Sequence, residues 1–384
     1  MNSYSFKLST YAPDSTVDPR GKNVGGAFIA PWGKRNDFPS TYSSLVDGST
    51  SAKACINLLE NRAKGDGFVI PEGTLGPNPL DSWDDILTKA LSDFILFQGF
   101  AFRVCLTKDG STVYFYPQDF QEIRLGRDGT DDEGFAFTSY DWTKVGTYPV
   151  QKYPIYDGTL AIGETKMLIF RNLKRGERYY HQPQSGSAGK WMATESSIAT
   201  YYENFVNNNF SATKLVTVPY ALSDEKEEEL YDNLKASFSG AENAASFVLL
   251  TGDGNGALPT ISTISSADAS LYDQVIDIVS RKICAAFGVQ SPSLAGIPQA
   301  SGFSSQAEEL IVANKSLELN TIKPLRDAFL ERVNRILHIH RNSEVDIKPI
   351  NLSKFYEDGT ISDQGSDLNS DDMGRINGGQ EFDE

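Results

Sequence analysis

The sequence is poor in cysteine and histidine, and it lacks any long apolar run. Three cysteines and three histidines occur in 384 residues, and no Cys-x-x-Cys pair is present. There is no stretch of about 18 apolar residues, so we predict no membrane-spanning helix. The N-terminal segment MNSYSFKLSTYAPD has no basic flank followed by an apolar stretch, so it does not read as a signal peptide.

The scarce cysteines and histidines are also badly placed for chemistry. Cys55, Cys105 and Cys284 lie far apart, each among apolar neighbours, and such a cysteine is usually a small buried hydrophobic residue. We expect all three to be structural, which agrees with a reducing cytoplasm. His338 and His340 are two positions apart, on different faces of a helix, with no ligating cluster nearby. We therefore predict no metal site and no cofactor.

Nucleotide-binding and hydrolase motifs are missing as well. Residues 185–190 (SGSAGK) lack the leading glycine and the following hydroxyl of a phosphate-binding loop. Gly252, Gly254 and Gly256 follow a predicted strand but open no helix. The enzymatic alternative is a hydrolase whose carboxylates meet only in the fold, such as a glycoside hydrolase. Four tryptophans in 384 residues are few for a sugar cleft, and we predict that the protein is not an enzyme.

The chain is acidic, with a formal net charge of −16. This charge argues against a protein that holds nucleic acid by releasing phosphate counterions, but not against one past which a duplex slides. Residues 342–384 carry eleven acidic and three basic residues, so this tail contributes −8, half of the total. The stretch 359–384 has few apolar anchors, and we expect it to be partly flexible.

The first half of the chain predicts a mixed α and β region. Residues 1–50, rich in Gly, Pro, Ser and Asn, predict an irregular arm or short strands. Helices are predicted at 51–62 and 83–97 from their apolar spacing. From 99 to 170, short aromatic and β-branched runs predict a small antiparallel β module. Its strongest hairpin signals are Asp109-Gly110 and Asp128-Gly129.

The second half predicts helices around a small insert. Helices at 194–209 and 267–287 flank a β-α-β insert, in which residues 224–229 (DEKEEE) form a solvated helix face. A turn-rich loop without charged residues follows at 291–303. The next helix runs from Ser305 to about His338, and Pro324 predicts a kink or break in its preceding turn.

The order of these elements resembles that of tailed-bacteriophage portal proteins over residues 30–340. Three stretches carry the resemblance: WGKRNDFPSTYSSLV (32–46), with a Gly-x-x-Asn-x-Phe-Pro segment, DFILFQGFAFRVCL (93–106) and ICAAFGVQSPSLAG (283–296). The third stretch has Gln290-Ser291-Pro292 where the family usually has Val-Pro. The long helix that follows it reaches Thr321-Ile-Lys-Pro324, as the helices of the family do.

The resemblance implies an α+β portal fold with an α/β wing, a helical stem, a β-α-β clip and a long kinked helix. The crown that normally follows is not expected, because the tail is short and acidic. The implied regions are the wing (1–190), the first stem helix (191–210), the clip (211–266), the second stem helix (267–288), the tunnel loop (289–303), the long helix returning toward wing or crown (304–340) and the acidic tail (341–384).

The resemblance also implies a function. Portal proteins form a ring of about twelve subunits at one capsid vertex, with double-stranded DNA passing through during packaging and ejection. The implied partners are terminase, a head–tail adaptor and the major capsid protein, without a membrane. The implied location is the virion, after assembly in the host bacterial cytoplasm. Besides the hydrolase, another virion structural protein remains an alternative.

Three groups of residues are candidates for these roles. The stem helix needs apolar contacts on both sides to close a ring, although a core helix of a monomer has the same periodicity. The ring-contact candidates are Leu271, Val275, Ile278, Val279 and Ile283. The channel candidates are Ser291, Ser293, Ile297, Gln299 and Ser301. The partner-binding candidates in the clip are Asp224, Glu227, Glu228 and Glu229.

Overall fold

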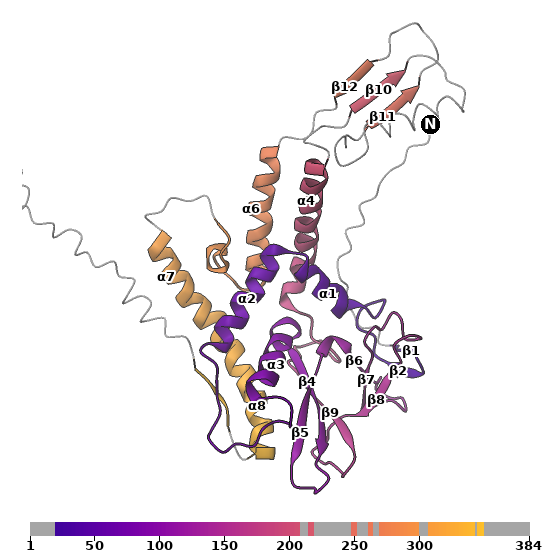
Figure 1. Ribbon diagram of the computed structural model, residues 1–384, viewed down its shortest axis with the longest axis vertical. Helices are drawn as coiled ribbons and strands as arrows, with labels where there is room; N and C mark the ends of the chain where they lie inside the picture. Colours follow the sequence, from indigo (N-terminus) through magenta and orange to yellow (C-terminus); the bar gives the residue numbers. More distant parts are fainter. Residues whose placement is uncertain are drawn as a thin grey trace, which may run out of the picture.

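The computed structural model describes residues 20–207, 214–218, 247–251, 260–263, 269–298, 306–341 and 344–348. Figure 1 shows a mixed α and β body from which two helices, α4 and α6, rise side by side. A small sheet lies beyond the far ends of these two helices (Figure 1). This mixed architecture agrees with the predicted α+β class.

Three helices of the body come first in the chain, after a short hairpin. The helix α1 was not predicted, because the serines and threonines of FPSTYSSLVD are weak helix formers. It forms because Pro39 suits the first turn and because Phe38, Tyr42 and Val46 bury one face. The elements are β1 (Lys22–Val24), β2 (Ala27–Ile29), α1 (Phe38–Asp47), α2 (Thr50–Lys64), β3 (Phe68–Val69) and α3 (Trp83–Phe97).

The two predicted helices have the start and stop signals that the sequence indicates. The Ser49 side chain accepts the Ala52 N–H at the start of α2, and Gly65 follows its last residue. Ser82 caps α3 in a reciprocal box with Asp85. These local signals fix the helix ends before any tertiary contact is considered.

The antiparallel β module predicted between residues 99 and 170 is present, and its six strands form two sheets. The Asp109-Gly110 and Asp128-Gly129 turns join antiparallel neighbours, as predicted. The sheets have the orders β5-β4-β9 and β6-β7-β8. Their strands are β4 (Gly99–Leu106), β5 (Val113–Gln118), β6 (Ile123–Leu125), β7 (Phe135–Thr138), β8 (Gln151–Pro154) and β9 (Thr165–Arg171), with the short helix η1 (Phe120–Glu122) before β6.

The two upright helices and the small sheet correspond to the predicted helices and insert. After the short helix η2 (Gln184–Ala188), α4 (Gly189–Asn207) begins five residues earlier than predicted, and α6 spans Ala269–Ala286. In the sheet, β10 (Lys214–Val218) pairs parallel with β11 (Phe247–Thr251). A parallel pair needs a crossover connection, which agrees with the predicted β-α-β order. The predicted helix of the insert, which includes residues 224–229, lies outside the described residues.

A third strand of this sheet corrects the prediction. The strand β12 (Thr260–Thr263) pairs antiparallel with β10. Its four residues, TIST, follow a glycine-rich stretch and are too short to show an alternating pattern. The segment therefore contains a three-stranded mixed sheet rather than only two strands.

The long helix is continuous but changes its hydrogen bonding in the turn before Pro324. It consists of α7 (Gln306–Leu317), a π-helical segment η4 (Glu318–Ile322) and α8 (Lys323–Arg341). Pro324 has no N–H to donate into that turn. After α8 the chain returns to the body, where β13 (Asp346–Ile347) pairs with β3.

One large core joins these elements. It contains buried side chains of α1, α2, α3, β4 and β5, and it includes the C-terminal half of α6 and much of α8. The C-terminal end of α6 is therefore part of the core of the body. Within the described ranges, no helix is long and apolar enough to cross a membrane.

Candidate stem and tunnel-loop site

The helix α6 divides the predicted ring contacts between two faces. Val279 and Ile283 are fully buried, at 0% exposure, in the subunit core. Val275 and Ile278 are 39% and 51% exposed. The monomer-core interpretation thus applies to one face of α6, and the other face carries large apolar side chains toward solvent. The side chain of Leu271 lies outside the described part.

The N-terminus of α2 is attached to α4 through one carboxylate. Glu195 of α4 accepts hydrogen bonds from the Ser49 hydroxyl, from the Ser51 hydroxyl at 2.7 Å and from the Ser51 N–H at 3.2 Å. A negative charge is favourable at a helix N-terminus, where the free N–H groups carry partial positive charge. This contact fixes the start of α2 against α4.

The middle of α2 contacts α6 through two cysteines. The sulfur atoms of Cys55 and Cys284 are 3.4 Å apart, and both side chains are buried. Both cysteines are buried in the core, as predicted, but the contact between them was not predicted. The Cys55 thiol donates to the Cys284 sulfur, which raises the pKa of Cys55 and lowers the pKa of Cys284. Cys105, on β4, is half-buried and remains a separate thiol.

The described first part of the tunnel-loop candidate is anchored to the body. The short helix η3 (Pro292–Ala295) contacts α2, α6 and α7. Pro292 is buried, and Ile297 packs partly buried against the main core. The Thr321 hydroxyl of the π-helical segment donates to the Gly288 carbonyl at 3.1 Å. Residues 291–298 are thus held in place by their neighbours.

The remaining predicted site residues divide into two groups. Ser291, which directly precedes η3, and Ser293, which lies within it, are half-buried. The other channel candidates and all partner-binding candidates lie outside the described residues, so their roles stay predictions. These candidates are Gln299, Ser301, Asp224, Glu227, Glu228 and Glu229.

The Gly-x-x-Asn-x-Phe-Pro segment proves to be a structural turn around a buried arginine. Asn36 adopts a left-handed backbone with φ 61°, and its side chain accepts the Trp32 N–H and the Arg124 Nε–H. Arg124 also donates to three carbonyls and lies 5.9 Å and 5.2 Å from the ring centres of Trp32 and Trp142. Burial lowers the pKa of Arg124 to about 10. Sequence reasoning found the segment but not its buried partner.

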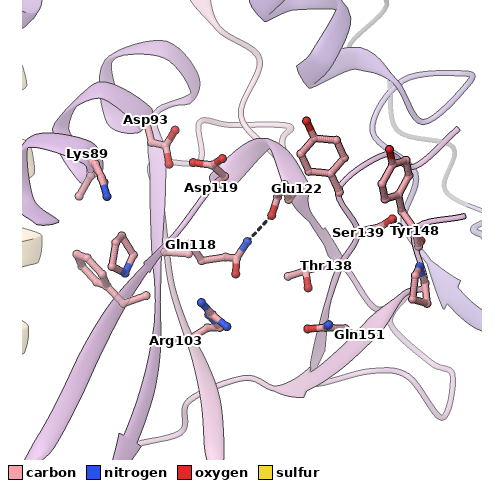
Figure 2. Close-up of a pocket in the computed structure, with 16 residues that line it drawn as sticks. Lys89, Asp93, Arg103, Gln118, Asp119, Glu122, Thr138, Ser139, Tyr148 and Gln151 are labelled. Carbon is pink, nitrogen blue, oxygen red and sulfur yellow. Dashed lines mark hydrogen bonds between the residues drawn. The ribbon is translucent and has the colours of Figure 1, made fainter. Parts of the chain in front are cut away.

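A cavity of about 710 Å³ opens between α3 and the two sheets of the body (Figure 2). Asp93 and Asp119 lie close together at one end of it, and Glu122 accepts a 2.6 Å hydrogen bond from Gln118 (Figure 2). Burial raises the pKa of Asp93 to about 8, although its side chain accepts the Phe120 N–H. No tryptophan lines this cavity.

These carboxylates give the hydrolase alternative its most concrete location, but Asp93 is already bound to the backbone. A glycoside hydrolase needs two carboxyl groups free to face a sugar from opposite sides. Among the described residues, no group of three or more His, Cys, Asp or Glu side chains could hold a metal ion.

Comparison with known families decides the classification. The phage portal protein family matches residues 73–356, about three quarters of the chain. The chain belongs to the phage portal protein family. This confirms the resemblance that the three sequence stretches indicated.

Solved structures share the fold of this portal chain at low sequence identity. A chain from the virion of a native gene transfer agent particle has a TM-score of 0.54 at 14% identity, with 90% of this chain and 91% of that chain covered. A chain from the neck of the native particle, computed with C12 symmetry, has 0.54 at 13%, covering 83% and 87%.

A portal protein of the HK97 family from Corynebacterium diphtheriae has a TM-score of 0.48 at 12% identity, covering 83% of this chain and 97% of that chain. No curated protein sequence matches this chain. At such identities, the likeness concerns the fold alone.

Proposed function

We propose that this chain forms the portal ring of a virion, at one vertex of the capsid. DNA passes through the ring during packaging and ejection. Membership of the portal family supports this function, and so does the shared fold with a chain from a particle neck computed with C12 symmetry. The ring then has about twelve subunits, related by rotation about the channel axis.

The exposed face of α6 is the observation that carries the ring proposal. Val275 and Ile278 are three positions apart, on one side of a helix, and both are large, apolar and exposed. A ring needs a head-to-tail contact between two different surfaces of each subunit. We assign the α6 face to one of these surfaces. Trp191 of α4, 36% exposed, is a candidate for the other.

The ring test replaces Ile278 with aspartate, because a charge in a subunit contact is strongly unfavourable. We expect wild-type rings and folded Ile278→Asp monomers by native mass spectrometry and electron microscopy. Leu80→Asp is the matched control, because Leu80 is 86% exposed and lies before α3, outside the stem. Val279→Asp would not discriminate, since Val279 belongs to the subunit core. Intact rings of Ile278→Asp would contradict the assignment.

We also propose that the tunnel loop lines the channel without holding DNA. The loop 291–303 has no charged side chain, and residues 291–298 are anchored, which leaves 299–303 as the channel-facing candidates. Rings should bind DNA weakly and without sequence preference. The substitutions Gln299→Lys and Ser301→Lys together should leave rings intact but retain DNA and slow packaging in vitro. If rings with both lysines package DNA at the normal rate and bind it no more tightly, the loop does not line the channel.

The clip is proposed as the docking site for terminase and the adaptor. Its acidic residues 227–229 would favour basic partner surfaces. Charge reversal there should weaken terminase binding in a pull-down with intact rings. Loss of the rings instead would assign the clip to subunit contacts.

The ring is proposed to have no nuclease or ATPase activity, which direct assays of the purified protein would check.

A further inference from the structure

The two buried cysteines at the α2–α6 contact have a geometry that the portal role does not require. Cys55 and Cys284 are separated by 229 positions in the chain, yet their sulfur atoms are 3.4 Å apart. Their exposures are 0% and 1%. A disulfide needs the two sulfurs at about 2.05 Å, so an approach of about 1.4 Å would join them.

We propose that Cys55 and Cys284 are a modification site at which hydrogen peroxide forms an intramolecular disulfide that locks α2 to α6. The reaction is two thiols and one hydrogen peroxide giving one disulfide and two waters. The sulfurs lose two electrons together, and the peroxide oxygens gain them.

The hydrogen bond between the thiols assigns the order of the steps. Because Cys55 donates its S–H, Cys284 is the sulfur that more readily becomes a thiolate. The Cys284 thiolate attacks one peroxide oxygen, the O–O bond breaks, and the released hydroxide takes up the Cys284 proton as water. The Cys55 sulfur then attacks the resulting sulfenic acid. The S–O bond breaks, and the departing hydroxide leaves with the Cys55 proton as the second water.

A cavity gives a small oxidant a path toward the buried pair. A second cavity of about 350 Å³ is lined by Leu59 of α2 and by Gly288 after α6. Each of these residues lies four positions after one of the cysteines, on the same side of the helix or its extension. The cavity therefore begins about one turn from the sulfurs. A cavity of this volume is large enough to hold hydrogen peroxide.

The link would join two elements that must keep one relative position if the wing is to hold the stem. Disulfides persist in oxidising surroundings such as virion surfaces and are rare in the reducing cytoplasm. The occasion for oxidation, release of the particle from the cell, therefore rests on the proposed function. The reaction does not, because it needs only the folded chain.

The test exposes the purified full-length protein to hydrogen peroxide, quenches with catalase, unfolds it without reductant and alkylates free thiols. Peptide mapping by mass spectrometry should show a Cys55–Cys284 cross-link, two hydrogens lighter, with Cys105 still alkylated. The midpoint of thermal unfolding should rise by about 5 °C, since a long loop is closed in the unfolded chain. Dithiothreitol should reverse the rise.

Three variants control this test. Cys105→Ser should retain the cross-link, whereas Cys55→Ser and Cys284→Ser should each lose both the cross-link and the rise in midpoint. The proposal is overturned if both cysteines remain alkylated, if the link forms only after unfolding, or if it involves Cys105. A cross-link without a rise in midpoint would overturn the locking role. A cross-link in a chain that forms no rings would leave this site intact and count against the portal ring.

Discussion

Replacing Glu195 with glutamine tests how the start of α2 is fixed to α4. Glutamine keeps the length and one oxygen acceptor but removes the charge. In the wild type, the carboxylate accepts hydrogen bonds from the Ser49 hydroxyl and from both the N–H and the hydroxyl of Ser51. All three donors belong to the first turn of α2 or its cap.

The contacts of Glu195 set the size of the effect. A hydrogen bond to a charged group contributes about 1.5–3 kcal/mol, compared with about 1 kcal/mol for a neutral pair. A charge at a helix N-terminus adds about 0.3–1 kcal/mol. For a half-buried carboxylate we expect Glu195→Gln to lower the free energy of unfolding by about 2 kcal/mol. Glu195→Ala, which also removes the acceptors, should cost about 3 kcal/mol.

Denaturant unfolding in the Ile278→Asp background, which we expect to be monomeric, measures this loss, and Ser51→Ala completes a double-mutant cycle. We expect a coupling free energy of about 1 kcal/mol between positions 195 and 51, because each single change breaks the same contacts. Glu203→Gln is the matched control, since Glu203 is an exposed carboxylate on the same helix. Equal losses of unfolding free energy for Glu195→Gln and Glu203→Gln, or a coupling free energy near zero, would refute the assignment of Glu195 as the contact that fixes α2 to α4.

Two further predictions concern the body. The folded-state pKa of Asp93 is raised to about 8, so its contribution to stability is full below about pH 4 and is lost as the pH rises through about 8. Denaturant unfolding should show wild type losing on the order of 4 kcal/mol between pH 5 and 8, and Asp93→Asn losing clearly less; parallel curves would contradict this. Arg124→Met should cost about 3–5 kcal/mol, because it leaves buried carbonyls without their donor. A loss below about 1 kcal/mol in the same assay would show that the buried guanidinium is dispensable.

The sequence predicted those parts of the fold that local signals specify. The Asp-Gly turns located the hairpins, and apolar spacing located α2 and α3, because each of these signals acts within its own segment. The helix α1 was missed because its stability comes from burying Phe38 and Tyr42 in a core that local propensity does not describe. The strand β12 was missed because four residues carry too little periodicity.

The site was predictable to a lesser degree. Periodicity identified the apolar residues of α6, but it could not tell that Val279 faces the subunit core while Ile278 faces solvent. Which face of a helix is buried depends on which other segments of the chain pack against it, and the helix's own periodicity does not show this. For the same reason, the contact between Cys55 and Cys284 could not be read from apolar neighbours 229 positions apart.

The position of α2 connects the body to α4, α6 and the start of the loop that follows α6. Its first turn is bound by Glu195 of α4, its middle contacts α6 through Cys55, and η3 packs against it. At its other end, the buried Arg326 of α8 donates to the carbonyls of Arg62 and Ala63 at 2.8 Å and 3.2 Å. A single rigid helix thus holds four elements. None of α4, α6, η3 and α8 can move relative to α2 without breaking at least one of these contacts.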